Sequence, residues 1–218
     1  LGQAGDWCTT PAQSINYASC HDNMTLLDRI SRSTPCVSEE DRIRMNNLSA
    51  VIYMTAQGIP FLQAGEEMLR TKIDASGGFV ENSYNSPDSV NSIKWDTLED
   101  EAYQNVYNYY KGLIAFRKAH AALRLTNAAD VNANITSVDD LDENVLAFRI
   151  NGGVNGETSD GIFVIFNPNS TETSVTLPDG AWDVCVNADH AGTDALTTVS
   201  GSVSAEPISA MVLVKKES

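Results

Sequence analysis

A run of three polar residues, His21, Asp22 and Asn23, follows the short apolar segment "SINYASC" and precedes the amphipathic stretch "MTLLDRI". A buried aspartate flanked by histidine can stabilise a developing positive charge, and His and Asn side chains can hydrogen-bond to sugar hydroxyls. This combination suits an oxocarbenium-like transition state. The triplet is also typical of a helix cap, in which Asp22 or Asn23 would cap the following helix. The residue types alone leave both interpretations open.

Other residues with reactive side chains have simpler explanations. Cys20 stands beside His21 and could be a thiol nucleophile, but a cysteine that closes a strand is more often a small buried hydrophobic residue. Glu66 and Glu67 follow a second apolar run, where a glutamate is usually a salt-bridging or capping group. The four cysteines form no CxxC pair and have no histidines at zinc-ligand spacing, so no structural zinc is expected.

The tryptophans and the remaining histidines are also predicted to be structural. Trp95 is expected to pack against its neighbours rather than to stack on a sugar. Trp182 lies in an alternating strand and is expected in the core. His120 and His190 show no partner at a useful spacing and are expected at the surface or at a cap.

The elements that must position these residues begin with a strand in "SINYASC". A helix is predicted from the N-cap Ser38 to the stop at Gly58, because acidic residues follow the cap and apolar residues recur at helical spacing. A second strand follows in "IPFLQ" and again ends in polar residues. The order strand, polar loop, helix, strand, polar loop is that of consecutive βα units.

A long irregular stretch from Met68 to Asp96 is predicted to be a functional loop, because it exceeds an ordinary connection. The next segment, "EDEAYQNVYNYYKGLIAFRKAH", predicts a helix. Its expected inner side consists of Ala102, Val106, Tyr110, Leu113, Ile114 and Arg117.

After Leu125 the periodicity changes from helical to alternating. Short apolar runs such as "VLAFRI" and "GIFVIFNP" are separated by Gly, Asn, Asp and Pro, which predicts an antiparallel sandwich with no long helix after Asn132. We therefore expect two domains, residues 1–127 and 128–218, the second with enough strands to fold without help. The expected fold class is α/β plus all-β.

Composition excludes several classes of protein. The 218 residues carry a formal net charge of −15, which repels a phosphate backbone, so no nucleic acid partner is expected. No apolar run reaches the roughly 20 residues of a membrane span. The N-terminal "LGQAGDWCTT" lacks the features of a signal peptide, although a piece cut from a longer protein would lack them too. Localisation stays open, and the cysteines lean towards a reducing, cytoplasmic compartment.

Four longer segments carry a resemblance to a known family: "NYASCHDNMTLLDRI", "DRIRMNNLSAVIYMTAQGIPFLQAGEEMLRTK", "NSYNSPDSVNSIKWD" and "YYKGLIAFRKAH". In this order and spacing they resemble the C-terminal part of a type I pullulanase, a debranching member of the α-amylase superfamily. The resemblance is dense from Ile15 to about Leu125 and looser over the sandwich. It implies that the two strands are the seventh and eighth of a (β/α)8 barrel, followed by the C-terminal β-sandwich.

The same resemblance implies a reaction and roles. The family cleaves α-1,6-glucosidic linkages of pullulan and branched dextrins with retention, and Asp22 would match its third catalytic carboxylate, which stabilises the transition state. His21 would bind sugar hydroxyls beside it, and Asn23 would lie at the subsite edge. Substrate-binding residues of neighbouring subsites would be Tyr84, Asn85 and Asp88.

The motifs of the family's nucleophile and acid/base are absent from these residues. A retaining glycosidase needs two carboxyl groups roughly 5 Å apart, so the chain is expected to be about the last third of a debranching enzyme and inactive alone. The expected partners are an α-glucan and the remainder of the barrel, supplied by a missing segment, another chain or self-association. No cofactor is expected, and calcium is conceivable only in the complete enzyme, with no site assignable here.

Two other classes stay open. One is a non-catalytic carbohydrate-binding protein in which Tyr84 and Trp95 stack on sugar rings. The other is a purely structural fragment.

Overall fold

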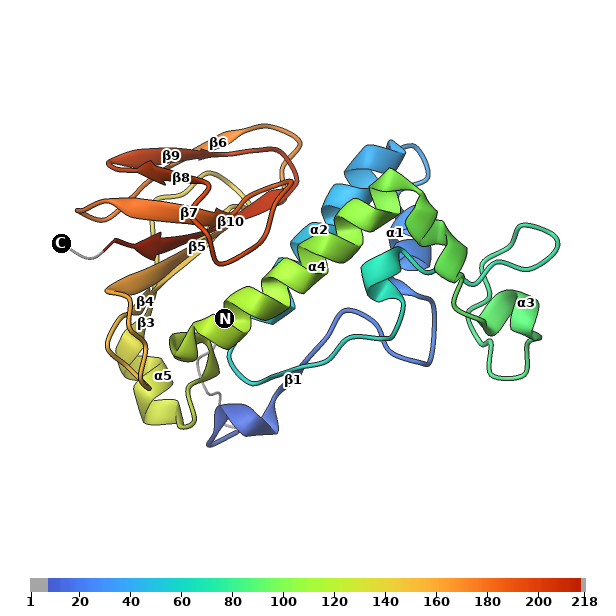
Figure 1. Ribbon diagram of the computed structural model, residues 1–218, viewed down its shortest axis with the longest axis horizontal. Coiled ribbons are helices and arrows are strands. Elements are labelled where there is room, and N and C mark those ends of the chain that lie inside the picture. Colours follow the sequence, from blue (N-terminus) through green and yellow to red (C-terminus); the bar gives the residue numbers. More distant parts are fainter. Residues whose placement is uncertain (1–7, 217–218) are drawn as a thin grey trace.

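The computed structural model describes residues 8–216, so part of the N-terminal segment discussed above lies outside the described residues. Helices and loops occupy the first part of the chain and β-strands the second (Figure 1). The helices are α1 (Leu26–Ser33), α2 (Glu39–Thr55), α3 (Asp88–Asn91), α4 (Glu101–Ala119) and α5 (Ala128–Asn134), with 3-10 turns η1 (Pro11–Gln13), η2 (Glu66–Met68), η3 (Trp95–Glu99) and η4 (Ala121–Arg124). The strands are β1 (Ile15–Asn16), β2 (Ile59–Pro60), β3 (Ile135–Ser137), β4 (Leu146–Asn151), β5 (Gly161–Asn167), β6 (Thr173–Thr176), β7 (Trp182–Val186), β8 (Thr197–Val199), β9 (Ser202–Ala205) and β10 (Ser209–Lys215). None of the helices in the described part of the chain combines the length and apolar character needed to cross a bilayer.

Helix α2 begins where the sequence predicts. The Ser38 hydroxyl accepts a hydrogen bond from the N–H of the third helical residue at 3.1 Å, and three acidic residues occupy the first turn. The helix ends at Thr55 and not at Gly58, because Ala56 already has extended backbone angles. Gly58, with φ of 101°, makes the turn into β2. A Cβ there would lie 2.8 Å from the carbonyl oxygens of Pro11 and Ser14.

The two predicted strands of the first part are present but short. Strand β1 pairs with β2 in parallel, with Ile15 opposite Ile59, and α1 and α2 form the connection between them. Parallel strands need such a crossover connection, which in this chain is helical. The carboxyl ends of both strands therefore point the same way.

The second part is an antiparallel β structure, as predicted. Six strands form one sheet in the order β3-β4-β5-β10-β7-β8, and β6 pairs with β9 in a second, two-stranded sheet. Strands β5 and β10 hold the centre, with Val212 opposite Val164. Among residues 135–216 no helix interrupts the strands.

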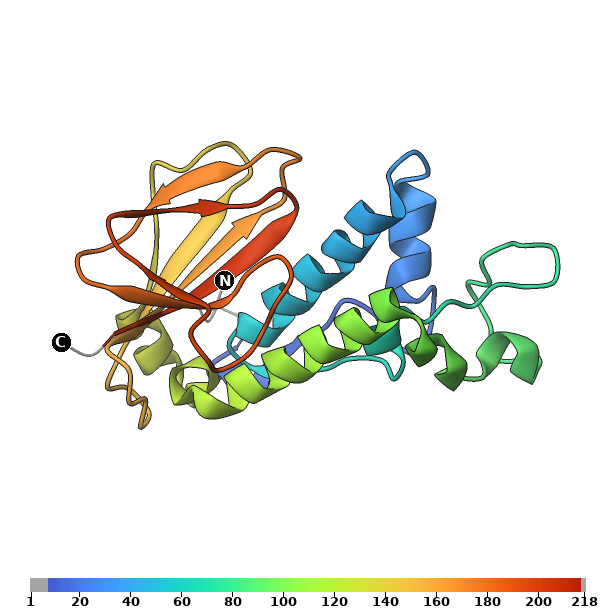
Figure 2. The same cartoon turned by 45° about the horizontal axis from the view of Figure 1, so that its top comes forward.

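Both faces of the large sheet are covered, by different layers (Figure 2). One face packs against β6 and β9 and contains Trp182, whose side chain is fully buried beside Phe163. The opposite face contributes Phe148, Val164 and other strand residues to a core that also contains residues of α2 and α4. The β part is therefore not self-contained, since one face of its main sheet packs against helices.

Helix α4 shows how this packing departs from simple periodicity. Four predicted inner residues are buried, whereas Ala102 and Ile114 are exposed. Tyr109 is buried instead, and its hydroxyl donates to the Asn187 carbonyl oxygen at 2.8 Å. The helix touches both α2 and the loop after β7, so its buried side is rotated relative to the predicted one. The buried residues of α4 are Val106, Tyr109, Tyr110, Leu113, Phe116 and Arg117.

Candidate active site

The predicted polar triplet lies in the loop that joins β1 to α1. The side chains of His21, Asp22 and Asn23 are all exposed, so Asp22 is not buried as its proposed chemistry suggested. Asp22 Oδ1 accepts a hydrogen bond from the Asn23 N–H at 3.0 Å, and Asn23 Oδ1 accepts one from the Met24 N–H at 2.9 Å. Asn23 has φ of 68°, in the left-handed region that asparagine tolerates better than most residues.

The capping alternative for the triplet is wrong. The N-cap of α1 is Thr25, whose hydroxyl accepts a hydrogen bond from the Asp28 N–H at 3.2 Å. The Asp22 and Asn23 side chains make their hydrogen bonds inside the loop, one residue onward. Their presence is therefore not explained by helix capping.

Cys20 is half-buried, not fully buried as expected.

A second loop runs alongside the first, because both follow the carboxyl ends of parallel strands. It extends from Ala64 to Lys72, and both ends of its 3-10 turn are left-handed, with φ of 96° at Gly65 and 53° at Leu69. Two contacts join the loops. The Ser19 hydroxyl donates to Glu66 Oε2 at 2.5 Å, and the Lys72 ammonium donates to the His21 carbonyl oxygen at 3.3 Å.

Glu66 is the most buried acidic group between these loops, with 4% of its surface exposed. Besides Ser19 it accepts hydrogen bonds at Oε1 from the hydroxyls of Tyr53 on α2, at 2.7 Å, and Tyr110 on α4, at 3.1 Å. Burial raises the pKa of Glu66, and the three hydroxyl donors oppose that rise. The expectation of a salt-bridging or capping role is wrong for Glu66. It holds for Glu67, which accepts a hydrogen bond from the Gly65 N–H at 2.9 Å.

A second buried carboxylate, Asp28 on α1, is joined by a hydrogen bond to the backbone of Lys72. Asp28 is fully buried, and its Oδ2 accepts a hydrogen bond from the Lys72 backbone N–H at 2.8 Å, while Oδ1 has no partner among residues 8–216. Burial raises the pKa of Asp28. The sequence predicts no role for Asp28 or Lys72, and it does not identify Glu66 as a hydrogen-bonding centre. The only signal was that polar residues flank the second apolar run.

The long loop after β2 carries the other predicted site residues. Tyr84 is 86% exposed, and Asn85 and Asp88 are exposed as well. The loop is shaped by Asn91, whose side-chain amide donates to the carbonyl oxygens of Ser83, at 2.7 Å, and Ser86, at 3.0 Å. Within the described part of the chain, no hydrogen bond or ion pair joins these three residues to the His21–Asn23 loop. The fold places them at the end of the molecule far from the sandwich (Figure 1).

The tryptophans and histidines give mixed outcomes. Trp182 is in the core, as predicted, but Trp95 is 66% exposed, so the packing prediction for it is wrong. His190 is exposed, as predicted. His120 caps the end of α4, as predicted, but it does have a partner, since its Nδ1 lies 3.1 Å from Glu157 Oε1, 37 residues along the chain.

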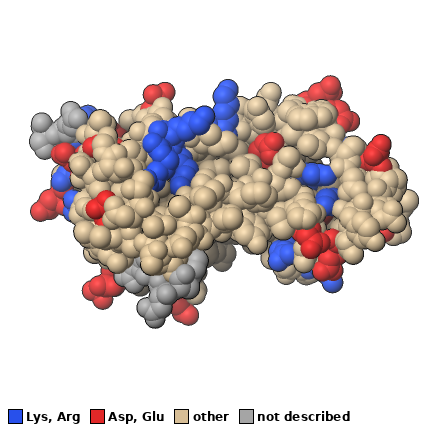
Figure 3. All heavy atoms as spheres, turned by 90° about the horizontal axis from the view of Figure 1, so that it is seen from below, with Lys and Arg blue, Asp and Glu red and all other residues tan. Residues whose placement is uncertain are grey.

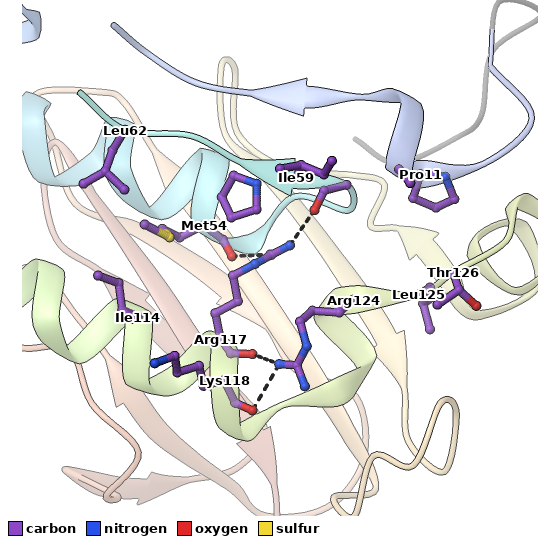
Figure 4. Close-up of a pocket in the computed structure, with 13 residues that line it drawn as sticks. Pro11, Met54, Ile59, Leu62, Ile114, Arg117, Lys118, Arg124, Leu125 and Thr126 are labelled. Atoms are coloured by element: carbon purple, nitrogen blue, oxygen red, sulfur yellow. Dashed lines mark hydrogen bonds between the residues drawn. The ribbon is translucent and has the colours of Figure 1, made fainter. Parts of the chain in front are cut away.

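A hollow of about 620 Å³ lies beside β2, away from the candidate site (Figure 4). The Arg117 guanidinium crosses it and donates to the carbonyl oxygens of Met54, at 2.6 Å, Ala56, at 2.8 Å, and Gly58, at 2.8 Å. Arg117 thus provides hydrogen-bond donors for the backbone carbonyl groups at the carboxyl end of α2 and in the turn into β2. Seen from below, the molecule shows a large group of basic side chains near the middle of a mostly uncharged face, with smaller basic and acidic groups towards its ends (Figure 3). Across residues 8–216, no three His, Cys, Asp or Glu side chains are grouped so that they could hold a metal ion.

Both the family models and the known sequences relate this chain to pullulanases. Residues 131–190 match the family model described as the pullulanase all-beta domain. The sequence is 39% identical over 140 residues to the pullulanase of Bacillus subtilis strain 168, covering 64% of this chain and 18% of that protein.

The solved structures agree. The pullulanase from Bacillus acidopullulyticus superposes with a TM-score of 0.89 at 38% identity, covering 95% of this chain and 25% of that one. A Paenibacillus barengoltzii pullulanase in complex with maltohexaose and α-cyclodextrin gives a TM-score of 0.82 at 36% identity, covering 100% of this chain and 32% of the other. The predicted resemblance to pullulanases is confirmed in sequence and in fold. The chain spans between about a fifth and a third of the length of these relatives.

Proposed function

We propose that this chain is the C-terminal part of a pullulanase-type glycoside hydrolase that cleaves α-1,6-glucosidic linkages in pullulan and branched dextrins with retention. The observation that carries the proposal is the pair of polar loops that leave the carboxyl ends of parallel strands β1 and β2 side by side. Enzymes built from β/α units carry their catalytic groups at this end of the strands. The relatives named above are pullulanases, and one of them was solved with maltohexaose.

In this proposal Asp22 stabilises the positively charged transition state. Its side chain is exposed in the loop, accepts a hydrogen bond from the next backbone N–H, and is not used as a helix cap. His21 and Asn23 bind hydroxyls of the glucose unit beside it. Tyr84, Asn85 and Asp88 line neighbouring subsites of the α-glucan.

The barrel assignment is part of the proposal, and exposed apolar side chains support it. Ile15, Tyr17, Ile59 and Phe61 are 59%, 55%, 48% and 44% exposed, and the rings of Tyr17 and Phe61 meet edge to face at 5.9 Å. Ile15 and Ile59 are paired across β1 and β2, and Tyr17 and Phe61 stand two residues further along each segment, so the four share one face. Parallel sheets are normally covered on both faces. We therefore propose that side chains of further parallel strands cover this face, as in the filled interior of a (β/α)8 barrel, with β1 and β2 as the last two strands.

The proposed domains are residues 1–127, belonging to the barrel, and 128–218, the sandwich. The proposed partner of the first is the remainder of the barrel, which would also supply the nucleophile and the acid/base. A retaining mechanism needs both groups. The 218 residues alone are therefore inactive in this proposal.

The test is a reducing-sugar assay on pullulan with the complete protein that carries these residues. Proton NMR of the first product formed should show the α-anomer, because retention keeps the configuration. The matched control is the isolated 218-residue chain, which should release no reducing sugar. Complete protein that leaves pullulan intact, or releases the β-anomer first, contradicts the proposal.

A non-catalytic carbohydrate-binding role is a second candidate, favoured by the exposed rings of Tyr84 and Trp95. Aromatic faces open to solvent can stack on sugar rings. Isothermal titration of the 218-residue chain with branched maltooligosaccharides tests it. Binding that is lost in Tyr84→Ala and Trp95→Ala, with no hydrolysis by the complete protein, would favour this role over the enzyme.

A further inference from the structure

The His21–Asn23 loop receives little support from its own side chains. The Asp22 and Asn23 side chains bond only to the next residue in the loop, and all three side chains of the triplet are exposed. A transition-state stabilising carboxylate must nevertheless be held within a fraction of an ångström of its working position. The backbone of the loop must therefore be fixed from outside the triplet.

The Cys20 thiol makes one such contact, a weak one to the Asp22 carbonyl oxygen at 3.7 Å, and Lys72 makes another from the neighbouring loop. Its ammonium donates to the His21 carbonyl oxygen at 3.3 Å, and its backbone N–H donates to Asp28 Oδ2 at 2.8 Å. Asp28 lies in the first turn of α1, directly after the loop. Lys72 thus contacts both ends of the loop: its side chain binds the first residue of the triplet, and its backbone binds the helix that follows the loop.

The cost of burying Lys72 indicates a specific role. Only 3% of its surface is exposed, and no carboxylate lies within ion-pair distance of its ammonium among the described residues. A buried ammonium without a close ion pair is unfavourable, and an apolar side chain of similar length would avoid that cost. Burial and the neighbouring Arg70 lower the pKa of Lys72, whereas the carboxylates of Asp28 and Asp22 oppose that change.

We infer that Lys72 is a positioning residue, which fixes the His21–Asn23 loop so that Asp22 meets the sugar cation. The inference rests on the proposed function. Lys72 acts through the His21 carbonyl oxygen and does not touch the substrate.

The experiment compares variants of the complete protein on pullulan. Lys72→Met removes the ammonium and keeps the length of the side chain, and Lys72→Arg keeps a cationic donor. Lys111→Met is the matched control, because Lys111 is an exposed lysine on α4. For Lys72→Met we expect kcat to fall about 30- to 100-fold with KM within twofold, since a misplaced catalytic group costs on the order of a hundredfold. Lys72→Arg should recover at least about tenfold of that loss, and Lys111→Met should match the unmodified protein.

Thermal unfolding separates positioning from a structural role. The Tm of Lys72→Met should stay within about 3 °C of the unmodified protein, because a desolvated charge is removed together with its hydrogen bond. A lower Tm with kcat unchanged overturns the inference. Should Lys72→Met fail to fold, Lys72→Gln replaces it. Its shorter amide should still lower kcat at least about tenfold, and an unchanged kcat again overturns the inference.

The outcomes also separate this inference from the proposed function. If the unmodified complete protein does not cleave pullulan, the proposed function fails. If it cleaves pullulan and Asp22→Asn abolishes turnover while Lys72→Met leaves it intact, only the positioning role of Lys72 is wrong.

Discussion

Residues 128–218, expressed without the rest of the chain, should fail to form a stable fold. Their central sheet has one face covered by α2 and α4 rather than by strands, and removing the helices exposes that face. The large apolar side chains concerned are Phe148, Ile150, Ile162, Val164, Phe166 and Val212. Full exposure of these six side chains costs about 9 to 18 kcal/mol, at about 1.5 to 3 kcal/mol each. The six side chains keep contacts with one another within the sheet, so they are only partly exposed. We therefore take about half of that free energy, about 5 to 9 kcal/mol, as the cost of removing the helices.

A loss of this size matches the whole stability of a typical domain, about 5 to 15 kcal/mol. The assay is urea unfolding followed by near-ultraviolet circular dichroism, in which the signal of the 128–218 segment includes its one tryptophan, Trp182, which faces the other layer of the sandwich. The 128–218 segment should bind the dye ANS and unfold without a cooperative transition, whereas the 218-residue chain should unfold cooperatively. A cooperative transition of the segment with a free energy of unfolding above about 3 kcal/mol, without ANS binding, would refute the reasoning.

Two further substitutions in the 218-residue chain test the packing and the electrostatics of its core. Gly112→Ala should destabilise the chain by about 1 to 3 kcal/mol despite the better helix propensity of alanine, because its Cβ would lie 1.8 Å from the Ala191 carbonyl oxygen. Gly192→Ala, where a Cβ meets open space, is the control, and equal stability of the two variants in urea contradicts the close approach. For Glu66, a native pKa raised above the ordinary 4.5 means that the native state binds the proton more tightly, so this group adds stability below pH 4.5 and loses it as pH rises through the native pKa. The Tm difference between the unmodified chain and Glu66→Gln should therefore shift in favour of the unmodified chain on acidification from pH 7, and a shift the other way would show that Glu66 is not held in a desolvated site.

Local signals explain what the sequence predicted well. Ser38 with its acidic first turn forms its cap within a few residues, so the start of α2 needed no tertiary information. The alternation around Trp182 likewise placed that side chain in the core. The helical and antiparallel parts follow from the change of period near Leu125.

The misses arise from contacts between distant parts of the chain. Glu66 and Glu67 are equivalent in sequence, and only the hydroxyls of Ser19, Tyr53 and Tyr110, 47, 13 and 44 residues away, make the first a buried hydrogen-bonding centre. The inner side of α4 was misjudged for the same reason. Its position is set by the loop after β7 as well as by α2.

The candidate site was predicted in part. The sequence located His21, Asp22 and Asn23 after a strand, and the structure places them together in the loop after β1. It could not show that the Lys72 ammonium donates to the His21 carbonyl oxygen, because this contact joins residues 51 positions apart. Nor could it show that Trp95 is exposed, since exposure depends on which elements pack nearby.

The catalytic role of Asp22 is tested most directly by the turnover number of Asp22→Asn in the complete protein on pullulan. Asparagine keeps the shape and much of the hydrogen bonding but loses the charge, which matters most when the anomeric carbon becomes positive. We expect kcat to fall by about a thousandfold or more, with KM and Tm nearly unchanged. Near-normal turnover of Asp22→Asn would contradict the catalytic role of this loop.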